Sequence, residues 1–145
     1  MSMLAHSEAD PMPTVRAVRC DHRADDDEVY EALRRATAPL TAAWERIRRA
    51  RTIAIKMNQT FPPEGRHPVD GVLQELVDAK VARATLRLLR EANPAAAITC
   101  VDTSPEARDE GLPMEANVAH LALLREFDVT LHDADQPPHL LAPVP

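Results

Sequence analysis

Three short apolar stretches, with helix-like segments between them, constrain the fold of this chain more than any other feature. They cover residues 52–57, 97–101 and 129–131, and they are mostly apolar, as strands buried in a sheet are. Strands that are joined by helical crossovers run parallel, and the crossovers are right-handed. A fourth strand is predicted at residues 14–20, where Val and Ala alternate with Arg. The pattern predicts an α/β fold with a mainly parallel sheet of about four strands and helices on both faces.

The segment between the predicted strands at residues 14–20 and 52–57 carries a helical pattern with a clear start. The acidic run at residues 25–28 suits the beginning of a helix, and Pro39 should interrupt that helix. A second apolar stripe then continues to about residue 50. Trp44, the only tryptophan, should be buried on this second helix, beside Leu40 and Ile47.

Two further helices are expected later in the chain. A long helical pattern covers residues 69–92, and Asp78 would cap a second helix if the pattern breaks near Val77. Another helix is predicted over residues 114–127. The residues expected to face inward from it are Val118, Leu121, Ala122 and Leu124.

Length and charge narrow the class of protein. The 145 residues suit one domain, predicted over residues 14–135, with a disordered tail at 1–13 and a proline-rich tail at 136–145. The net charge of −6 and the small aromatic content, with one Trp, one Tyr and two Phe, argue against nucleic-acid binding. The sequence has neither a signal-peptide pattern nor an apolar run of about 18 residues, so we expect no membrane association and a cytoplasmic location.

Cysteine usage indicates no cofactor. Cys20 and Cys100 are the only two cysteines, and no CxxC pair occurs, so this chain alone cannot supply a four-thiolate zinc or iron–sulfur site. Both lie in strand-like stretches, where cysteine is typically a small buried hydrophobe.

Polar side chains follow two of the predicted strands and form the candidate ligand site. Lys56 and Asn58 follow the first apolar stretch, and Asp102 and Ser104 follow the second. Ligands of open α/β sheets bind outside the carboxyl ends of the strands, and a partly desolvated ammonium favours an anionic partner. The alternatives are a lysine that reaches to water for Lys56, and a helix cap or turn for Asp102 and Ser104. The other polar residues at these ends are Gln59, Thr60 and Thr103.

A divalent metal at the end of the last predicted strand is a weaker hypothesis. His132, Asp133 and Asp135, with Asp102 nearby, have the residue types of a metal site, but this spacing is common in loops. We therefore assign no metal ligand. The three isolated glycines form neither a dinucleotide fingerprint nor a phosphate-binding loop, and no GxSxG motif occurs.

Several short motifs resemble a known family. TIAIKMN at residues 52–58 is similar to the strand ending in Ile-Lys-Pro-Asn of the family called domain of unknown function 362, with Met57 in the proline position. KVARA at residues 80–84 and LLREANP at residues 88–94 resemble the start and the end of the helix that follows that strand. The resemblance implies an α/β fold and a ligand face that includes Lys56.

Later motifs extend this resemblance over residues 14–135. VDTSP at residues 101–105 resembles the turn after the family's next strand, and FDVTLHD at residues 127–133 resembles a later strand. The sequence departs from the family at residues 77–79, where Val-Asp-Ala replaces the common Thr-Asp-Pro. Family members usually continue further, and some carry an iron–sulfur module whose cysteines are absent here, so the chain resembles the first half of such a domain or a short relative.

Two functional hypotheses follow. The first is a domain that binds an anionic small molecule through Lys56, Asn58, Asp102 and Ser104. The second is a non-catalytic fragment or accessory subunit that completes its sheet with a partner chain or a second copy, because an unfinished sheet leaves an exposed edge. The residues identify no reaction, so whether the chain is an enzyme stays open at this point.

Overall fold

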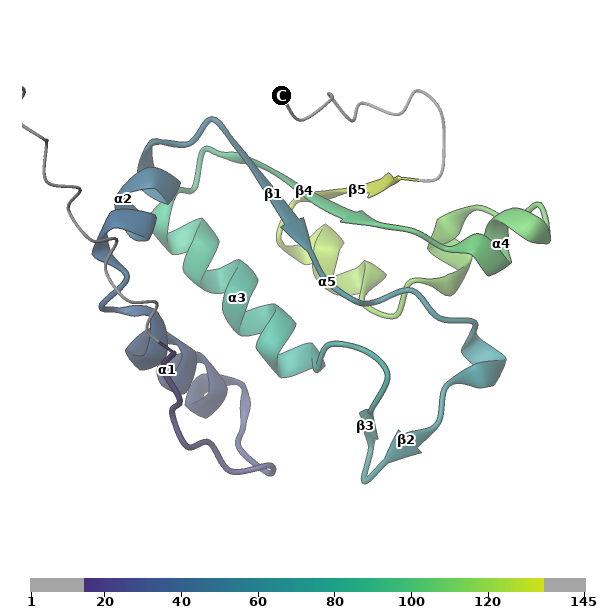
Figure 1. Cartoon of the computed structure of the whole chain (residues 1–145), viewed down its shortest axis with the longest axis horizontal. Coiled ribbons are helices and arrows are strands. Elements are labelled where there is room, and N and C mark those ends of the chain that lie inside the picture. The colour runs from purple at the N-terminus through teal and green to yellow at the C-terminus, as the bar shows by residue number, and fades with distance from the viewer. Residues whose placement is uncertain (1–14, 135–145) are drawn as a thin grey trace, which may run out of the picture.

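A three-stranded parallel sheet forms the centre of the molecule in the computed structural model, which describes residues 15–134 (Figure 1). The strands are β1 (Thr52–Lys56), β4 (Ala97–Asp102) and β5 (Val129–Asp133), and their order across the sheet is β1-β4-β5. Each of the three apolar stretches is therefore a strand, and the mainly parallel α/β fold is confirmed.

Helices occupy most of the remaining described chain. They are α1 (Asp26–Thr37), α2 (Thr41–Arg49), α3 (Ala79–Ala92), α4 (Pro105–Asp109) and α5 (Leu121–Glu126), with the short 3₁₀ helices η1 (Pro63–Gly65) and η2 (Met114–Asn117). None of the helices within residues 15–134 is long and apolar enough to cross a membrane. The predicted tails at residues 1–13 and 136–145 lie outside the described residues.

The start of α1 and the break before α2 follow the sequence signals. The Asp25 carboxylate accepts a hydrogen bond from the Glu28 N–H at 2.9 Å, and the Glu28 carboxylate accepts one from the Asp25 N–H, also at 2.9 Å. This capping box satisfies two backbone donors that the first turn would leave unpaired. Pro39 lies between the two helices, as predicted.

The long helix predicted over residues 69–92 is confirmed only from Ala79 onward. Residues before it form a small antiparallel pair, β2 (Pro68–Val69) and β3 (Val72–Leu73). Asp70 and Gly71 join them with φ angles of 50° and 79°, the left-handed values of a hairpin turn in which Asp-Gly is favoured. The Asp-Gly turn therefore overrides the helical spacing.

Asp78 is the N-cap of α3, as the sequence allowed. Its carboxylate accepts hydrogen bonds from the N–H groups of Lys80 at 2.8 Å and Val81 at 3.2 Å. These are backbone donors that have no partner within the helix, so Asp78 fixes where α3 starts.

The predicted strand at residues 14–20 is wrong for the part that the structure describes. Residues 15–20 have no regular structure, and Val15 is 95% exposed. An arginine falls among the apolar residues on each side of this stretch, so neither side offers enough apolar surface to stabilise an edge strand. The expectation that Cys20 is buried fails with it, because Cys20 is exposed, whereas Cys100 is buried as predicted.

The helix predicted over residues 114–127 is divided into η2 and α5. Between them, the Phe61 N–H donates to the Asn117 carbonyl at 3.0 Å, and the Ala119 N–H donates to the Gln59 carbonyl at 2.9 Å. This short extended contact with the loop after β1 unwinds the helical pattern. Of the residues expected to face inward, Val118 and Leu124 are buried, Leu121 is half-buried and Ala122 is exposed.

The hydrophobic core lies on one face of the sheet. Both crossovers move along the sheet in the same direction, from β1 to β4 and from β4 to β5, and right-handed crossovers of that kind place α3 and α5 on the same face (Figure 1). The buried core side chains on that side are Met57, Ala82, Leu86, Leu89, Ile98, Cys100, Leu123, Leu124 and Val129.

The opposite face of the sheet has no helix over it within residues 15–134. Its side chains alternate with those of the core face and are small or polar, and they are exposed or half-buried: Thr52, Ala54, Thr99, Val101 and Thr130. The described helices therefore cover one face of the sheet and not the two that were expected.

Trp44 is half-buried, so its predicted full burial is wrong. Its ring packs against the core beneath the sheet and against a second cluster formed by Tyr30, Ala84 and Leu88. The indole Nε1 donates to the carbonyl of Thr37 at 2.8 Å, which joins α2 to the end of α1. This indole N–H needs a polar partner near the surface, and that requirement keeps part of the ring accessible.

Candidate functional site

Lys56 and Asp102 form an ion pair where β1 and β4 end. The Lys56 Nζ lies 2.5 Å from Asp102 Oδ1, and it also donates to the Met57 carbonyl at 3.2 Å. The Lys56 side chain is 60% exposed, whereas the Asp102 side chain is 3% exposed. A buried carboxylate thus holds an ammonium that remains accessible from solvent.

The parallel register explains why these two residues meet. Lys56 lies beside Val101, so Asp102 is one residue further along the neighbouring strand. The carboxyl ends of parallel strands lie at one edge of a sheet, which is the basis of the predicted ligand site.

Asp102 accepts more hydrogen bonds than the ion pair alone. The Gln59 N–H donates to Oδ2 at 3.1 Å, the Thr60 hydroxyl lies 3.0 Å from the same oxygen, and the Thr103 N–H donates to Oδ1 at 3.0 Å. Burial alone would raise the pKa of Asp102, but the hydrogen bonds from Lys56 and from these groups outweigh it and lower the pKa. Asp102 is therefore a carboxylate at neutral pH.

Ser104 is close to Asp102 in the chain but its hydroxyl is already used. It is 2% exposed, its Oγ accepts the Ala107 N–H at 3.4 Å as the cap of α4, and it lies 2.9 Å from the amide nitrogen of Asn117. This is the capping alternative that the sequence allowed. Nothing in the sequence indicates that Asn117 belongs to this region, because only the tertiary fold brings it next to Ser104.

Asn58 lies in the loop after β1 and contacts a different part of the molecule. Its amide nitrogen donates to the Glu75 carbonyl at 2.7 Å, and its own carbonyl accepts the Val77 N–H at 2.8 Å. Of the four predicted ligand-binding residues, the structure thus brings Lys56 and Asp102 together, whereas Asn58 and Ser104 stabilise the neighbouring loops.

A buried glutamine lies beneath the ion pair. Gln59 is completely buried, and its amide nitrogen lies 3.0 Å from the Cys100 Sγ. Its carbonyl oxygen Oε1 has no hydrogen-bond partner among the described residues. Burial raises the pKa of the Cys100 thiol, so this sulfur is a protonated packing group at neutral pH.

The described residues contain no cluster of side chains that would support the metal hypothesis. Within residues 15–134, no group of three or more His, Cys, Asp or Glu side chains is arranged to hold a metal ion. His132 and Asp133 lie beside Val101 and Asp102 in the sheet, and Asp135 lies outside the described residues.

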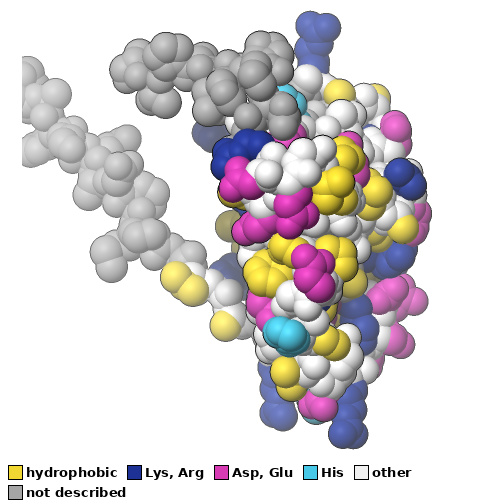
Figure 2. Space-filling model, turned by 90° about the vertical axis from the view of Figure 1, so that its right-hand side faces the viewer, with side chains coloured by type: hydrophobic (Ala, Val, Ile, Leu, Met, Phe, Trp, Pro, Cys, Tyr) yellow, Lys and Arg dark blue, Asp and Glu magenta, His cyan; other side chains and the backbone are white. Residues whose placement is uncertain are grey.

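The end of the molecule beyond β4 and β5 has no broad basic surface. Figure 2 shows acidic and apolar side chains mixed over this side, with many of the Lys and Arg side chains toward its margins. An anion bound here would be held by individual contacts with Lys56, rather than by the summed field of many cations.

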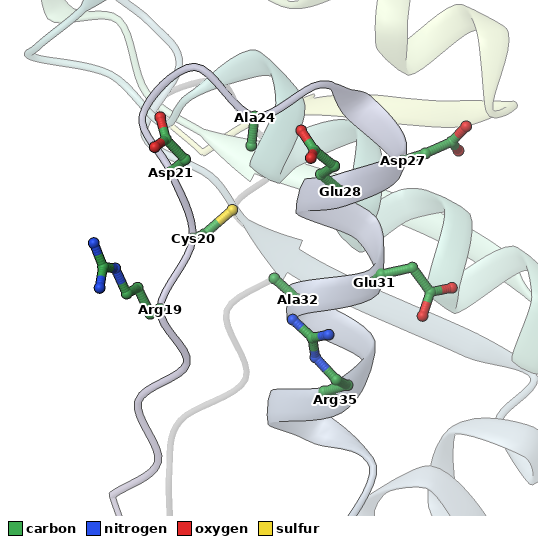
Figure 3. A pocket seen from close by; sticks show the side chains of 9 residues that line it. All are labelled: Arg19, Cys20, Asp21, Ala24, Asp27, Glu28, Glu31, Ala32 and Arg35. Carbon is green, nitrogen blue, oxygen red and sulfur yellow. The ribbon is translucent and has the colours of Figure 1, made fainter.

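A cavity of about 410 Å³ lies away from the strand ends, between residues 19–24 and α1, where Cys20 faces Ala32 (Figure 3). Side chains of both charges surround it, including Arg19, Glu28 and Arg35, so it favours no one charge of ligand.

The comparisons with known proteins add no assignment: no family model, no curated protein and no solved structure matches the chain. The resemblance to domain of unknown function 362 therefore stays a hypothesis that rests on the short motifs alone.

Proposed function

We propose that this chain binds an anionic small molecule at the carboxyl ends of β1 and β4, with the Lys56 ammonium as the contacting group. The observation that carries the proposal is the contrast in exposure within one ion pair, 60% for Lys56 and 3% for Asp102. The buried Asp102 positions the ammonium, and a carboxylate or phosphate would reach it from solvent. The motifs shared with domain of unknown function 362 include Lys56 and agree with this assignment.

The geometry changes the roles of the other predicted residues. Asn58 and Ser104 support the loops around the site through their hydrogen bonds to Glu75 and to the first turn of α4. Because Asp102 offsets the charge of Lys56, we expect weak to moderate affinity, and selectivity for anions small enough to share the ammonium with Asp102.

A thermal-shift screen of carboxylates and phosphates tests this proposal. A bound anion raises the melting temperature of the parent, and the rise grows with the logarithm of one plus the ratio of anion concentration to dissociation constant. Lys56→Gln should lose this rise, Lys56→Arg should keep part of it, and Lys80→Gln, which changes the only other lysine, should respond like the parent. Each variant is compared with itself without anion, since Lys56→Gln also leaves Asp102 unpaired. Equal stabilisation of Lys56→Gln and parent, or no stabilisation of the parent by any anion, would refute the role of Lys56.

A second candidate function is supported by the uncovered face and by the outer edge of β1. Parallel sheets are almost always covered on both faces, whereas this one is covered on one within residues 15–134. The Arg51 carbonyl accepts the Ala97 N–H at 3.0 Å, and backbone groups alternate in direction along a strand, so the N–H and C=O of Ala54 point away from β4. Within residues 15–134, β1 is the edge strand of the sheet and no other strand pairs with its outer side.

A second copy of the chain fits this edge. Antiparallel pairing about a two-fold axis at Ala54 would place Ile53 opposite Ile55 of the second copy, and Thr52 opposite its Lys56. The isoleucines would extend the core across the axis, and no like charges would face each other. We propose this homodimer as the form in which the sheet is completed.

Light scattering coupled to size-exclusion chromatography distinguishes the dimer from the monomer. Ala54→Pro removes an outward N–H and should give a monomer that keeps the parent's circular dichroism, because an edge strand tolerates proline where its N–H faces solvent. Ala54→Val keeps the N–H and should remain dimeric. A parent that stays monomeric at the highest accessible concentration contradicts the homodimer.

A further inference from the structure

A groove between α1, α2 and α3 lies on the side of α3 that faces away from the sheet (Figure 1). Its volume is about 370 Å³, near the lower end for small-molecule sites and suited to a molecule of one or two rings. The residues that form it include Tyr30 and Trp44, two of the four aromatic residues in the chain.

The aromatic walls of this groove are fixed by hydrogen bonds. The Trp44 indole is held by the Thr37 carbonyl at 2.8 Å, and the Tyr30 hydroxyl donates to the Glu91 carboxylate. The guanidinium of Arg87 stacks over Tyr30, 3.8 Å from the ring centre. A groove whose rings are already held in place loses little conformational entropy when a flat ligand enters.

One cation at the groove has no side-chain partner within residues 15–134. Arg34 forms a salt bridge with Glu31 at 2.7 Å, and the Glu91 carboxylate is compensated by Arg87 at 3.0 Å in addition to Tyr30. Arg48 makes no side-chain hydrogen bond or ion pair with the described residues, and it lies one helical turn after Trp44. A guanidinium presents parallel N–H groups that match both oxygens of a carboxylate.

We infer that this groove binds a small planar molecule that carries a carboxylate, with its ring against Trp44 and its carboxylate on Arg48. Leu88 and Ala92 provide the apolar floor. The inference is independent of the site at Lys56, because α3 lies between the groove and the sheet.

The single tryptophan makes the test direct, since the indole N–H gives one cross-peak in a ¹H–¹⁵N spectrum. Titration of the full chain with 2-naphthoate should move that peak to saturation. Arg48→Gln should weaken the affinity about tenfold, the scale of one charge-assisted contact. Arg46→Gln is the matched control, because Arg46 is an exposed arginine on the same helix that does not line the groove, and it should bind like the parent.

Two further observations distinguish this inference from nonspecific binding of an aromatic molecule. The neutral analogue 2-naphthylmethanol should bind about tenfold more weakly than 2-naphthoate, again because one charge-assisted contact is lost. The indole peak reports on this groove because Trp44 lines it, whereas Lys56 does not, so the movement of that peak separates the groove from the strand-end site. Equal binding of both probes, equal affinity of Arg48→Gln and parent, or an indole peak that does not move at millimolar probe would overturn the inference.

Discussion

The two faces of the sheet are made by the same three strands, yet they have different chemistry. Toward α3 and α5 the strands present Ile98, Cys100 and Val129, all buried, whereas the opposite face presents Thr99, Val101 and Thr130. The first face stabilises the fold through apolar burial. Within residues 15–134 no helix packs on the second face, so it contributes less apolar burial to the fold. Alternation along each strand thus gives one sheet a buried apolar face and a more polar, uncovered one.

The largest expected effect is on the covered face. Ile98→Ala should lower the free energy of unfolding by about 3 kcal/mol, because Ile98 is 1% exposed and the cavity would be closed in by α3 and α5. Val101→Ala, three residues along on the opposite face, should cost under about 1 kcal/mol. Urea denaturation of both variants checks the contrast, and comparable losses would mean that the second face is covered as well.

The next largest loss of stability is expected at the carboxyl ends of β1 and β4. Asp102→Asn should cost about 2 kcal/mol at neutral pH, because the neutral amide cannot accept all the bonds that the carboxylate accepts from Lys56, Gln59, Thr60 and Thr103. An Asp102→Asn variant as stable as the parent would show that the ion pair adds nothing to folding.

The same substitution changes how stability depends on acid. The pKa of Asp102 is lower in the folded chain than in the unfolded chain, so its contribution is fully present above the unfolded pKa, about 4, and is lost as the pH falls through the folded pKa. The parent should therefore lose more stability than Asp102→Asn as the pH falls from neutral through the unfolded pKa of about 4 and on toward the lower folded pKa. Parallel pH profiles from urea unfolding would contradict this assignment.

A loss no larger than that at Asp102 is predicted on the side of α3 that faces away from the sheet. Trp44→Ala should cost about 2 kcal/mol, less than the truncation of a fully buried aromatic, because the ring is half-buried. Circular dichroism measures the loss, and the emission of the parent should lie between that of buried and exposed indole. A loss larger than that of Ile98→Ala would place Trp44 in the main core.

The sequence was informative where one local signal acted without competition. The three apolar stretches predicted the three strands, and Asp25 and Asp78 predicted helix starts that the structure confirms. The helical spacing at residues 69–77 failed because the Asp-Gly turn there stabilises a hairpin. Residues 15–20 carried an alternating pattern with too little apolar surface to join the sheet.

The position of the candidate site could be predicted from the sequence, but the contacts between its residues could not. The rule that ligands bind beyond strand ends selected Lys56 and Asp102, and the two meet. That they pair with each other depends on the register between β1 and β4, which no local pattern specifies. Ser104 could be recognised only as a polar residue near a helix start, and the structure shows its hydroxyl in the capping hydrogen bond from the Ala107 N–H.

The hydrogen bonds at Asp102 also constrain the order of events in folding. Lys56 and Gln59 precede Asp102 by 46 and 43 residues, so the loop after β1 has these partners only once β4 has docked beside β1. Closing a loop of that length is entropically costly, and contacts of large sequence separation form late. During synthesis the residues around Lys56 emerge first and remain without their carboxylate partner until the chain has grown past β4. We therefore expect completion of this ion pair to be a late step, and its formation to report that β1 and β4 have paired.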